Sequence, residues 1–188
     1  MFLGFDVSTS IVGWSLLKNG GQLEKFGYVK MTKKAFEKNL FLKMDYFLSE
    51  LHDTLLEYKD SIDHWAVEEA VKKFSGGKSS ANTIFTCASF NFGVAYSVYS
   101  LLEKKPVYIP VTTARKLVGL KIPRGLDKNE KKSKVVEWCT PRHPSIKWEY
   151  GRTGKYSPWC YDVADSLVLT EALRLKHGSS STSTLGSN

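Results

Sequence analysis

The chain has 188 residues, of which 42% are hydrophobic and 13% aromatic, and its formal net charge is +8. This length and composition are typical of one globular domain with a substantial core, and they exclude a fibrous or largely disordered chain. We find no secretory signal and no apolar run as long as a membrane span. Cys87, Cys139 and Cys160 lack zinc-ligand spacing, so we expect reduced thiols in an intracellular protein.

The excess positive charge is concentrated in one segment. Between Lys104 and Lys155, fourteen Lys or Arg residues stand against four Asp or Glu residues, a net +10, whereas the rest of the chain carries −2. A nucleic-acid backbone is the natural partner for such a field. A solvated basic face that serves solubility has the same composition, so charge alone leaves both interpretations open.

The first seventeen residues predict two strands that surround an acidic residue. Apolar residues lead from Phe2 to Asp6, small polar residues turn the chain, and a second apolar run reaches Leu17 before the hairpin signal Asn19-Gly20. An Asp in a covered strand is costly unless its charge is paired, which indicates a metal ligand or an acid/base group. The alternative is an Asp that caps the following turn.

The remaining pattern predicts an α/β fold: a mixed five-stranded sheet, antiparallel in its first three strands and parallel later, flanked by helices. The other strands are expected over Gln22–Lys30, Ile62–Ala70 and Pro106–Ile109, and the helices over Lys34–Lys59, Ala81–Lys104, Val111–Gly119, Glu130–Cys139 and Tyr161–Lys176. We expect one domain over residues 1–177 and a disordered Ser-rich tail over residues 178–188. The helix Ala81–Lys104 is apolar on most of its circumference, so either its own chain or a second copy must cover it.

Two further segments are irregular. Residues 71–80 combine glycines, serines and lysines around Phe74, which indicates a mobile loop. Residues 140–160 hold three prolines, two glycines, two tryptophans and two tyrosines without a clear period. We interpret this second segment as an ordered insertion.

Carboxylates in three of the predicted elements form a candidate metal centre. Asp162 and Asp165 lie three residues apart on one helix face, about 5–6 Å between Cβ atoms. Glu68 and Glu69 point to opposite faces of their strand, so only one can join Asp6. Such all-oxygen clusters suit Mg²⁺ or Mn²⁺, and two ions about 4 Å apart are a standard device for phosphodiester hydrolysis. The alternative for Asp162 is a helix cap.

Four short motifs occur in a fixed order: Leu3-Gly4-Phe5-Asp6 followed by Ser8, Gly13-Trp14-Ser15, Trp65-Ala66-Val67-Glu68 and Asp162-Val163-Ala164-Asp165. Together they resemble the RuvC family of Holliday junction resolvases, which are nucleases of the RNase H-like and retroviral-integrase type. The resemblance extends from Phe2 to about Lys176 and implies an RNase H-like fold. It selects Glu68 rather than Glu69 as the fourth carboxylate.

The resemblance also assigns basic residues. It implies that Lys132, at the start of a basic helix, acts in catalysis beside the carboxylates, and that Phe74 is an aromatic wedge at the branch point. Charge and position give the other candidate DNA contacts, which are Lys72, Lys73, Lys78, Arg115, Lys116, Lys121, Arg124, Lys128, Lys131 and Lys134. The insertion over residues 140–160 is longer than expected for the bacterial enzyme, which suggests a viral or organellar branch, in the cytoplasm, a viral factory or an organelle matrix.

The function implied is that of a metal-dependent endonuclease which nicks four-way DNA junctions symmetrically, leaving 5′-phosphate and 3′-hydroxyl ends. Asp6, Glu68, Asp162 and Asp165 would hold two Mg²⁺ ions, with Mn²⁺ able to substitute, in a homodimer formed through helix 81–104. No membrane partner is expected. One alternative is an RNase H-like nuclease for RNA or general branched and flap DNA, and another is a non-catalytic DNA-binding scaffold. An ATP-binding protein of the actin and sugar-kinase type would need two such domains, for which the chain is too short.

Overall fold

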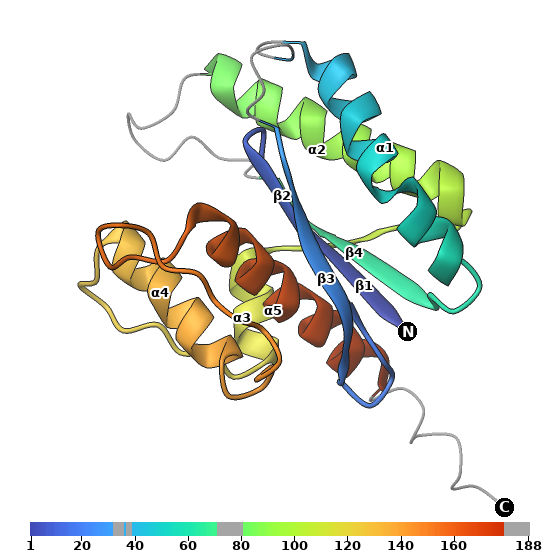
Figure 1. The fold of residues 1–188 in the computed structure, drawn as a ribbon. Coiled ribbons are helices and arrows are strands. Elements are labelled where there is room, and N and C mark those ends of the chain that lie inside the picture. Colours follow the sequence, from blue (N-terminus) through green and yellow to red (C-terminus); the bar gives the residue numbers. More distant parts are fainter. Residues whose placement is uncertain (32–35, 37–38, 71–80, 179–188) are drawn as a thin grey trace, which may run out of the picture.

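The computed structural model describes residues 1–31, 36, 39–70 and 81–178. Figure 1 shows a central sheet with helices on both faces. The strands are β1 Phe2–Val7, β2 Ile11–Leu17, β3 Leu23–Lys30, β4 His64–Glu68 and β5 Val107–Ile109. The helices are α1 Leu40–Tyr58, α2 Ala81–Leu102, α3 Val111–Leu117, α4 Lys128–Cys139 and α5 Pro158–Gly178.

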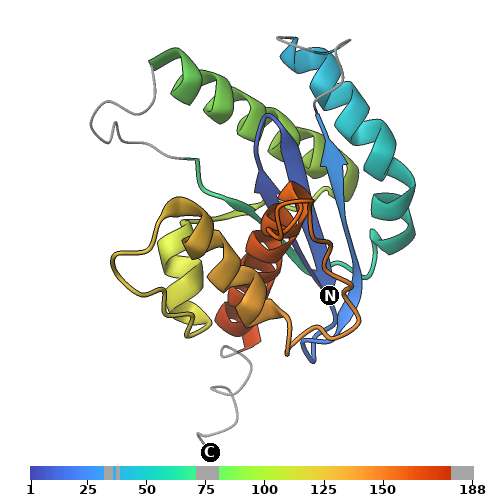
Figure 2. The ribbon, with the colours of Figure 1, turned by 60° about the vertical axis from the view of Figure 1, so that its left-hand side comes forward.

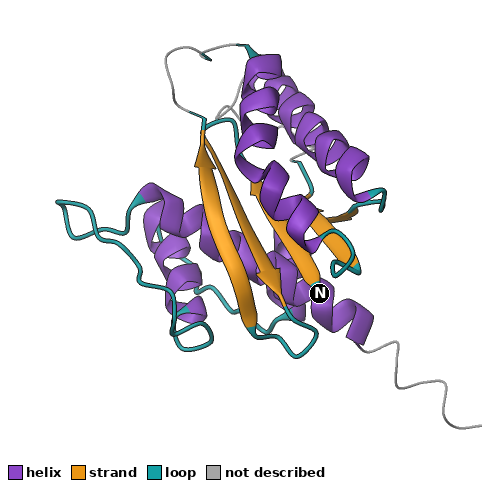
Figure 3. Cartoon of the chain, turned by 45° about the vertical axis from the view of Figure 1, so that its right-hand side comes forward, coloured by secondary structure: helices purple, strands orange, loops and turns teal. Residues whose placement is uncertain are grey.

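The sheet has the order β3-β2-β1-β4-β5, with β1 at its centre. β1 pairs antiparallel with β2 and parallel with β4, and β4 pairs parallel with β5. This arrangement confirms the predicted mixed sheet. Figure 3 shows the strands lying between two groups of helices, and alternate residues of β1 contribute to two cores. Leu3 and Phe5 pack with α1 and α2, whereas Phe2 packs with the core that contains α5.

Two glycines of the β1–β2 hairpin allow α5 to lie directly against the sheet. A Cβ at Gly4 would collide with Thr170, and one at Gly13 would collide with the backbone of Asp162. The approach is fixed by a buried hydrogen bond of 2.7 Å between the hydroxyls of Ser15 and Thr170. The hairpin motif therefore sets how closely α5 packs on the sheet, and with it the position of the two helical aspartates.

Helix ends differ from the sequence-based expectation where capping decides them. α1 begins at Leu40 because the Asn39 side chain accepts a hydrogen bond from the backbone N–H of Leu42. α4 begins at Lys128, two residues before its predicted start at Glu130, because Asp127 and Glu130 form a capping box. α5 begins at Pro158, so Asp162 lies inside the helix and the helix-cap interpretation of this residue is wrong.

α2 requires one further correction. By length and composition alone, this helix is long and apolar enough to cross a membrane. The expectation that no apolar run is as long as a membrane span is therefore wrong. In this fold, Phe90, Val94 and Val98 are buried on the sheet side of α2. The cysteines of the chain are free thiols, as expected.

Candidate active site

The topology brings the acidic residues of three elements to one end of the sheet. Asp6 and Glu68 lie near the carboxyl ends of the neighbouring parallel strands β1 and β4, whose register pairs Phe5 with Val67. Gly13 lies opposite Asp6 on β2, and the backbone of Asp162 packs onto this glycine. The structure therefore brings β1, β4 and α5 together at the end of the sheet, where the motifs place their acidic residues.

The electrostatics show that these carboxylates share one buried site. Burial raises the pKa of Asp6 well above its usual value, and the negative charges of Glu68, Asp165 and Asp162 raise it further. Burial, followed by the charge of Asp165, raises the pKa of Glu68 to about 7. Burial raises the pKa of Asp162 to about 6, against the lowering effect of the Lys132 ammonium. Carboxylates in this arrangement repel one another unless cations offset their charge.

Two basic side chains supply part of that positive charge. Arg115 on α3 forms an ion pair with Asp165, at 3.0 Å between Nη2 and Oδ1. Lys132 on α4 lies 3.9 Å from Oδ1 of Asp162. Nε of Arg115 is buried and has no hydrogen-bond partner among the residues that the structure describes. Both cations therefore offset part of the negative charge of the helical aspartates.

The other candidate DNA contacts lie further out. An exposed basic surface on α3, α4 and the segment between them carries the remaining positive charges predicted for this region. Its residues are Lys116, Lys121, Arg124, Lys128, Lys131 and Lys134. Lys134 also forms an ion pair of 2.6 Å with Glu137. Lys72, Lys73, Phe74 and Lys78 lie outside the described residues.

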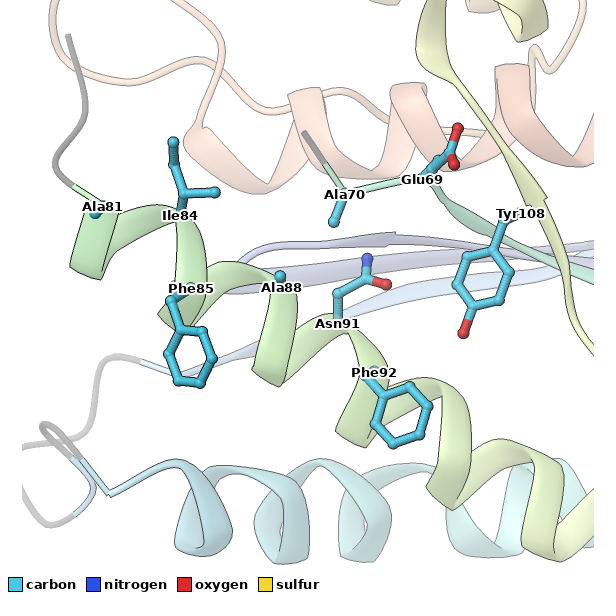
Figure 4. A pocket seen from close by; sticks show the side chains of 9 residues that line it. All are labelled: Glu69, Ala70, Ala81, Ile84, Phe85, Ala88, Asn91, Phe92 and Tyr108. Atoms are coloured by element: carbon cyan, nitrogen blue, oxygen red, sulfur yellow. The ribbon is translucent and has the colours of Figure 1, made fainter. Parts of the chain in front are cut away.

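The two neighbouring glutamates have different surroundings. Glu68 is one of the charges that act on Asp6. Glu69 lines a pocket of about 820 Å³ between α2 and β5, together with Phe85, Phe92 and Tyr108 (Figure 4). The structure thus brings Glu68, and not Glu69, into the carboxylate cluster, as the resemblance implied.

Two polar residues position the site: Ser8, which belongs to the first motif, and Asn91, which the sequence did not single out. Oγ of Ser8 accepts hydrogen bonds from the backbone N–H groups of Ser10 and Ile11 and donates one to the Ile11 carbonyl. Ser8 therefore holds the turn after β1, a role that the alternative interpretation had given to Asp6. Nδ2 of Asn91, buried in the apolar helix α2, donates to the carbonyl oxygen of Glu68 at 3.0 Å. The sequence offered one indication of this role for Asn91, namely an amide side chain among apolar residues of its helix.

The donor chemistry of the cluster fits a hard divalent cation, because all four side chains offer carboxylate oxygens and burial leaves their charge poorly solvated. In the part of the chain that the structure describes, no group of three or more His, Cys, Asp or Glu side chains has an arrangement that could hold a metal ion. Arg115 and Lys132 are the groups that lie against the helical aspartates. The carboxylate oxygens suit a hard divalent cation, and a magnesium site at this cluster stays a prediction.

Comparison with known proteins supports this fold assignment. No protein-family model matches the chain, and no curated protein sequence matches it. Among solved structures, RuvC of Thermus thermophilus is similar, with a TM-score of 0.61 and 11% identity over 95% of this chain and 96% of that chain. T. thermophilus RuvC in complex with a Holliday junction substrate has a TM-score of 0.57 and 13% identity, covering 95% of both chains. The chain has the RuvC-like form of the RNase H fold.

Proposed function

We propose that this protein is a magnesium-dependent endonuclease that cuts four-way DNA junctions. The observation that carries the proposal is the buried cluster of Asp6, Glu68, Asp162 and Asp165 in a RuvC-like fold. One of the similar structures is a RuvC bound to a Holliday junction substrate. Paired nicks that leave 5′-phosphate and 3′-hydroxyl ends are part of this proposal.

The chain's own residues would bind and orient the scissile phosphate. The four carboxylates would hold Mg²⁺ or Mn²⁺, which when bound supplies an activated water and offsets the charge that develops on the phosphate. Arg115 and Lys132, which lie against Asp165 and Asp162, would contact phosphate oxygens. The exposed basic residues of α3, α4 and the segment between them would hold the flanking backbone without reading its sequence.

We also propose that two copies assemble through α2. Phe85, Phe92 and Tyr96 are 73%, 66% and 61% exposed on this helix, and two of them line the 820 Å³ pocket. A second copy of the same helix would cover this apolar face, and two active sites related by a twofold axis would match a junction with two equivalent strands. Light scattering should give the mass of a dimer, and a monomer in the presence of junction DNA would contradict this assembly.

The decisive experiment compares end-labelled substrates of matched sequence. A four-way junction, a flap and an RNA–DNA hybrid are incubated with the protein, with and without Mg²⁺, and the products are mapped on a denaturing gel. We expect symmetric nicks in the junction only when Mg²⁺ is present. Preferential cleavage of the hybrid would favour an RNase H-like activity, and binding without cleavage in Mg²⁺ or Mn²⁺ would favour the non-catalytic scaffold.

A further inference from the structure

Aromatic rings form a continuous row from the carboxylates to the protein surface. Tyr161 follows Cys160 on α5, and its ring lies 5.4 Å from Nζ of Lys132. Tyr156 meets Tyr161 edge-on at 6.1 Å between ring centroids. Tyr150 stacks on Tyr156 at 4.7 Å, with the two hydroxyl oxygens 3.2 Å apart. Because Tyr150 is 61% exposed, the outer end of this row is open to solvent.

A second group of rings supports the row from the side of the sheet. Tyr28 on β3 stacks on Trp159 at 5.0 Å, and Trp159 stacks on Trp148 at 6.2 Å. The indole N–H of Trp159 donates to Oε2 of Glu149 at 2.7 Å, which ties the residue before Tyr150 to α5. Nζ of Lys30 lies 5.5 Å from the centroid of the Tyr28 ring. A lysine therefore stands beside the aromatic surface.

The backbone holds these rings in place. The segment 140–157 leads from α4 to the start of α5, drawn in orange in Figure 2. Gly151 donates to the carbonyl of Lys155 at 2.7 Å, and Ser157 donates to that of Glu149 at 2.8 Å. Tyr150 and Tyr156 form an isolated antiparallel bridge. A ligand that stacks on Tyr150 would meet a surface that is already ordered, which lowers the entropic cost of binding.

Packing of the insertion alone does not account for the outer ring. An anchoring aromatic is expected to be buried, and Trp159 is only 8% exposed, whereas Tyr150 presents most of its surface to solvent. The segment around Tyr150 is also basic, with four exposed Lys or Arg residues and one Glu. These residues are Arg142, Lys147, Glu149, Arg152 and Lys155. Exposed aromatic faces among basic side chains are the elements with which proteins bind unpaired nucleotides.

We propose that Tyr150 is a stacking site for an unpaired DNA base on the strand that passes the carboxylates. Tyr156 and Tyr161 align its ring with the active site, and Lys30 contacts the backbone of the same strand. The inference rests on the proposed function, and it adds a ligand class and a specificity role for residues 140–157. Selection of the nucleotide next to the cleaved phosphate would then depend on how well its base stacks.

The test measures binding and base stacking without cleavage. Each variant is made in the Asp6→Asn background and mixed, in the absence of divalent metal, with a four-way junction or a single strand that carries 2-aminopurine near the branch point. Tyr150→Leu removes the ring, Tyr150→Phe keeps it, and Phe41→Leu removes an exposed ring from α1 as a control. We expect Tyr150→Leu to weaken binding about 10-fold and to change the 2-aminopurine fluorescence, because a stacked base contributes about 1–3 kcal/mol.

The controls separate this proposal from the proposed function. Tyr150→Phe and Phe41→Leu should bind within twofold of the background protein, and melting curves should show that all variants fold. If Tyr150→Leu matches Phe41→Leu in affinity and fluorescence while the parent still cuts junctions, only the stacking site is refuted. If Tyr150→Leu loses binding but the parent cuts no DNA, the stacking site stands and the nuclease proposal fails. If the background protein binds neither DNA and the parent cuts none, both proposals fail.

Discussion

Glu68→Gln tests the electrostatics of the cluster most directly. The carboxyl of Glu68 has its pKa raised from 4.5 to about 7, first by burial and then by Asp165. At pH 8 the folded protein must therefore keep an ionised carboxylate that its surroundings disfavour. Gln has nearly the same shape and no charge, so the substitution should stabilise the metal-free protein at this pH.

The size of the effect follows from the change in proton affinity. A rise in pKa from 4.5 to about 7 corresponds to about 3 kcal/mol, since each unit represents 1.36 kcal/mol. For a chain of this size, that free energy raises Tm by about 6–12 °C. Below pH 4.5 the carboxyl is protonated in both folded and unfolded chains, so Glu68→Gln should match the parent there. The gain should appear between pH 4.5 and 7 and stay constant above, because the parent loses stability over that range.

Melting curves at pH 4, 6 and 8, with and without Mg²⁺, provide the assay. Mg²⁺ should stabilise the parent at pH 8 and have a smaller effect on Glu68→Gln, because the variant lacks one negative ligand. Glu69→Gln is the matched control, since it removes the neighbouring charge from a side chain that lines the α2 pocket instead. The reasoning is refuted if metal-free Glu68→Gln melts at or below the parent temperature at pH 8 while Glu69→Gln is unchanged.

Three other substitutions test the catalytic, dimeric and packing roles. Asp6→Asn should bind a four-way junction about as tightly as the parent, since exposed basic residues supply the affinity. It should cut the junction at least ~10²-fold more slowly. Near-normal cleavage would remove Asp6 from the catalytic set. Phe92→Glu should convert the proposed dimer to a monomer in light scattering, and an unchanged mass would exclude α2 as the interface. Gly13→Ala should lower the free energy of unfolding by about 1–3 kcal/mol because its Cβ meets the backbone of Asp162. Gly20→Ala is the control and should cost less stability, because its Cβ meets only a flexible side chain. Equal urea midpoints for the two variants would contradict the close packing of α5.

The order of the elements, the mixed sheet and the carboxylates that meet at its end could be predicted from the sequence. These features depend on local patterns. Short, nearly continuous apolar runs define β1 and β2, and the three-residue spacing of Asp162 and Asp165 places both on one helical turn. Gly13 was part of a recognised motif, although only the structure explains it, through the collision that a Cβ would make with α5. The choice of Glu68 over Glu69 came from the family resemblance rather than from strand geometry.

Contacts between side chains that are distant in the sequence depend on how whole elements pack. Arg115 and Asp165 are 50 residues apart, and their ion pair depends on how α3 packs against α5. Tyr28 and Trp159 stack because the first turn of α5 lies beside β3, a contact that no sequence period encodes. Local propensity acts between near neighbours, whereas such contacts depend on crossing angles and on the depth to which whole elements pack. The basic residues could therefore be identified from composition, but their division between the carboxylates and the surface required the folded chain.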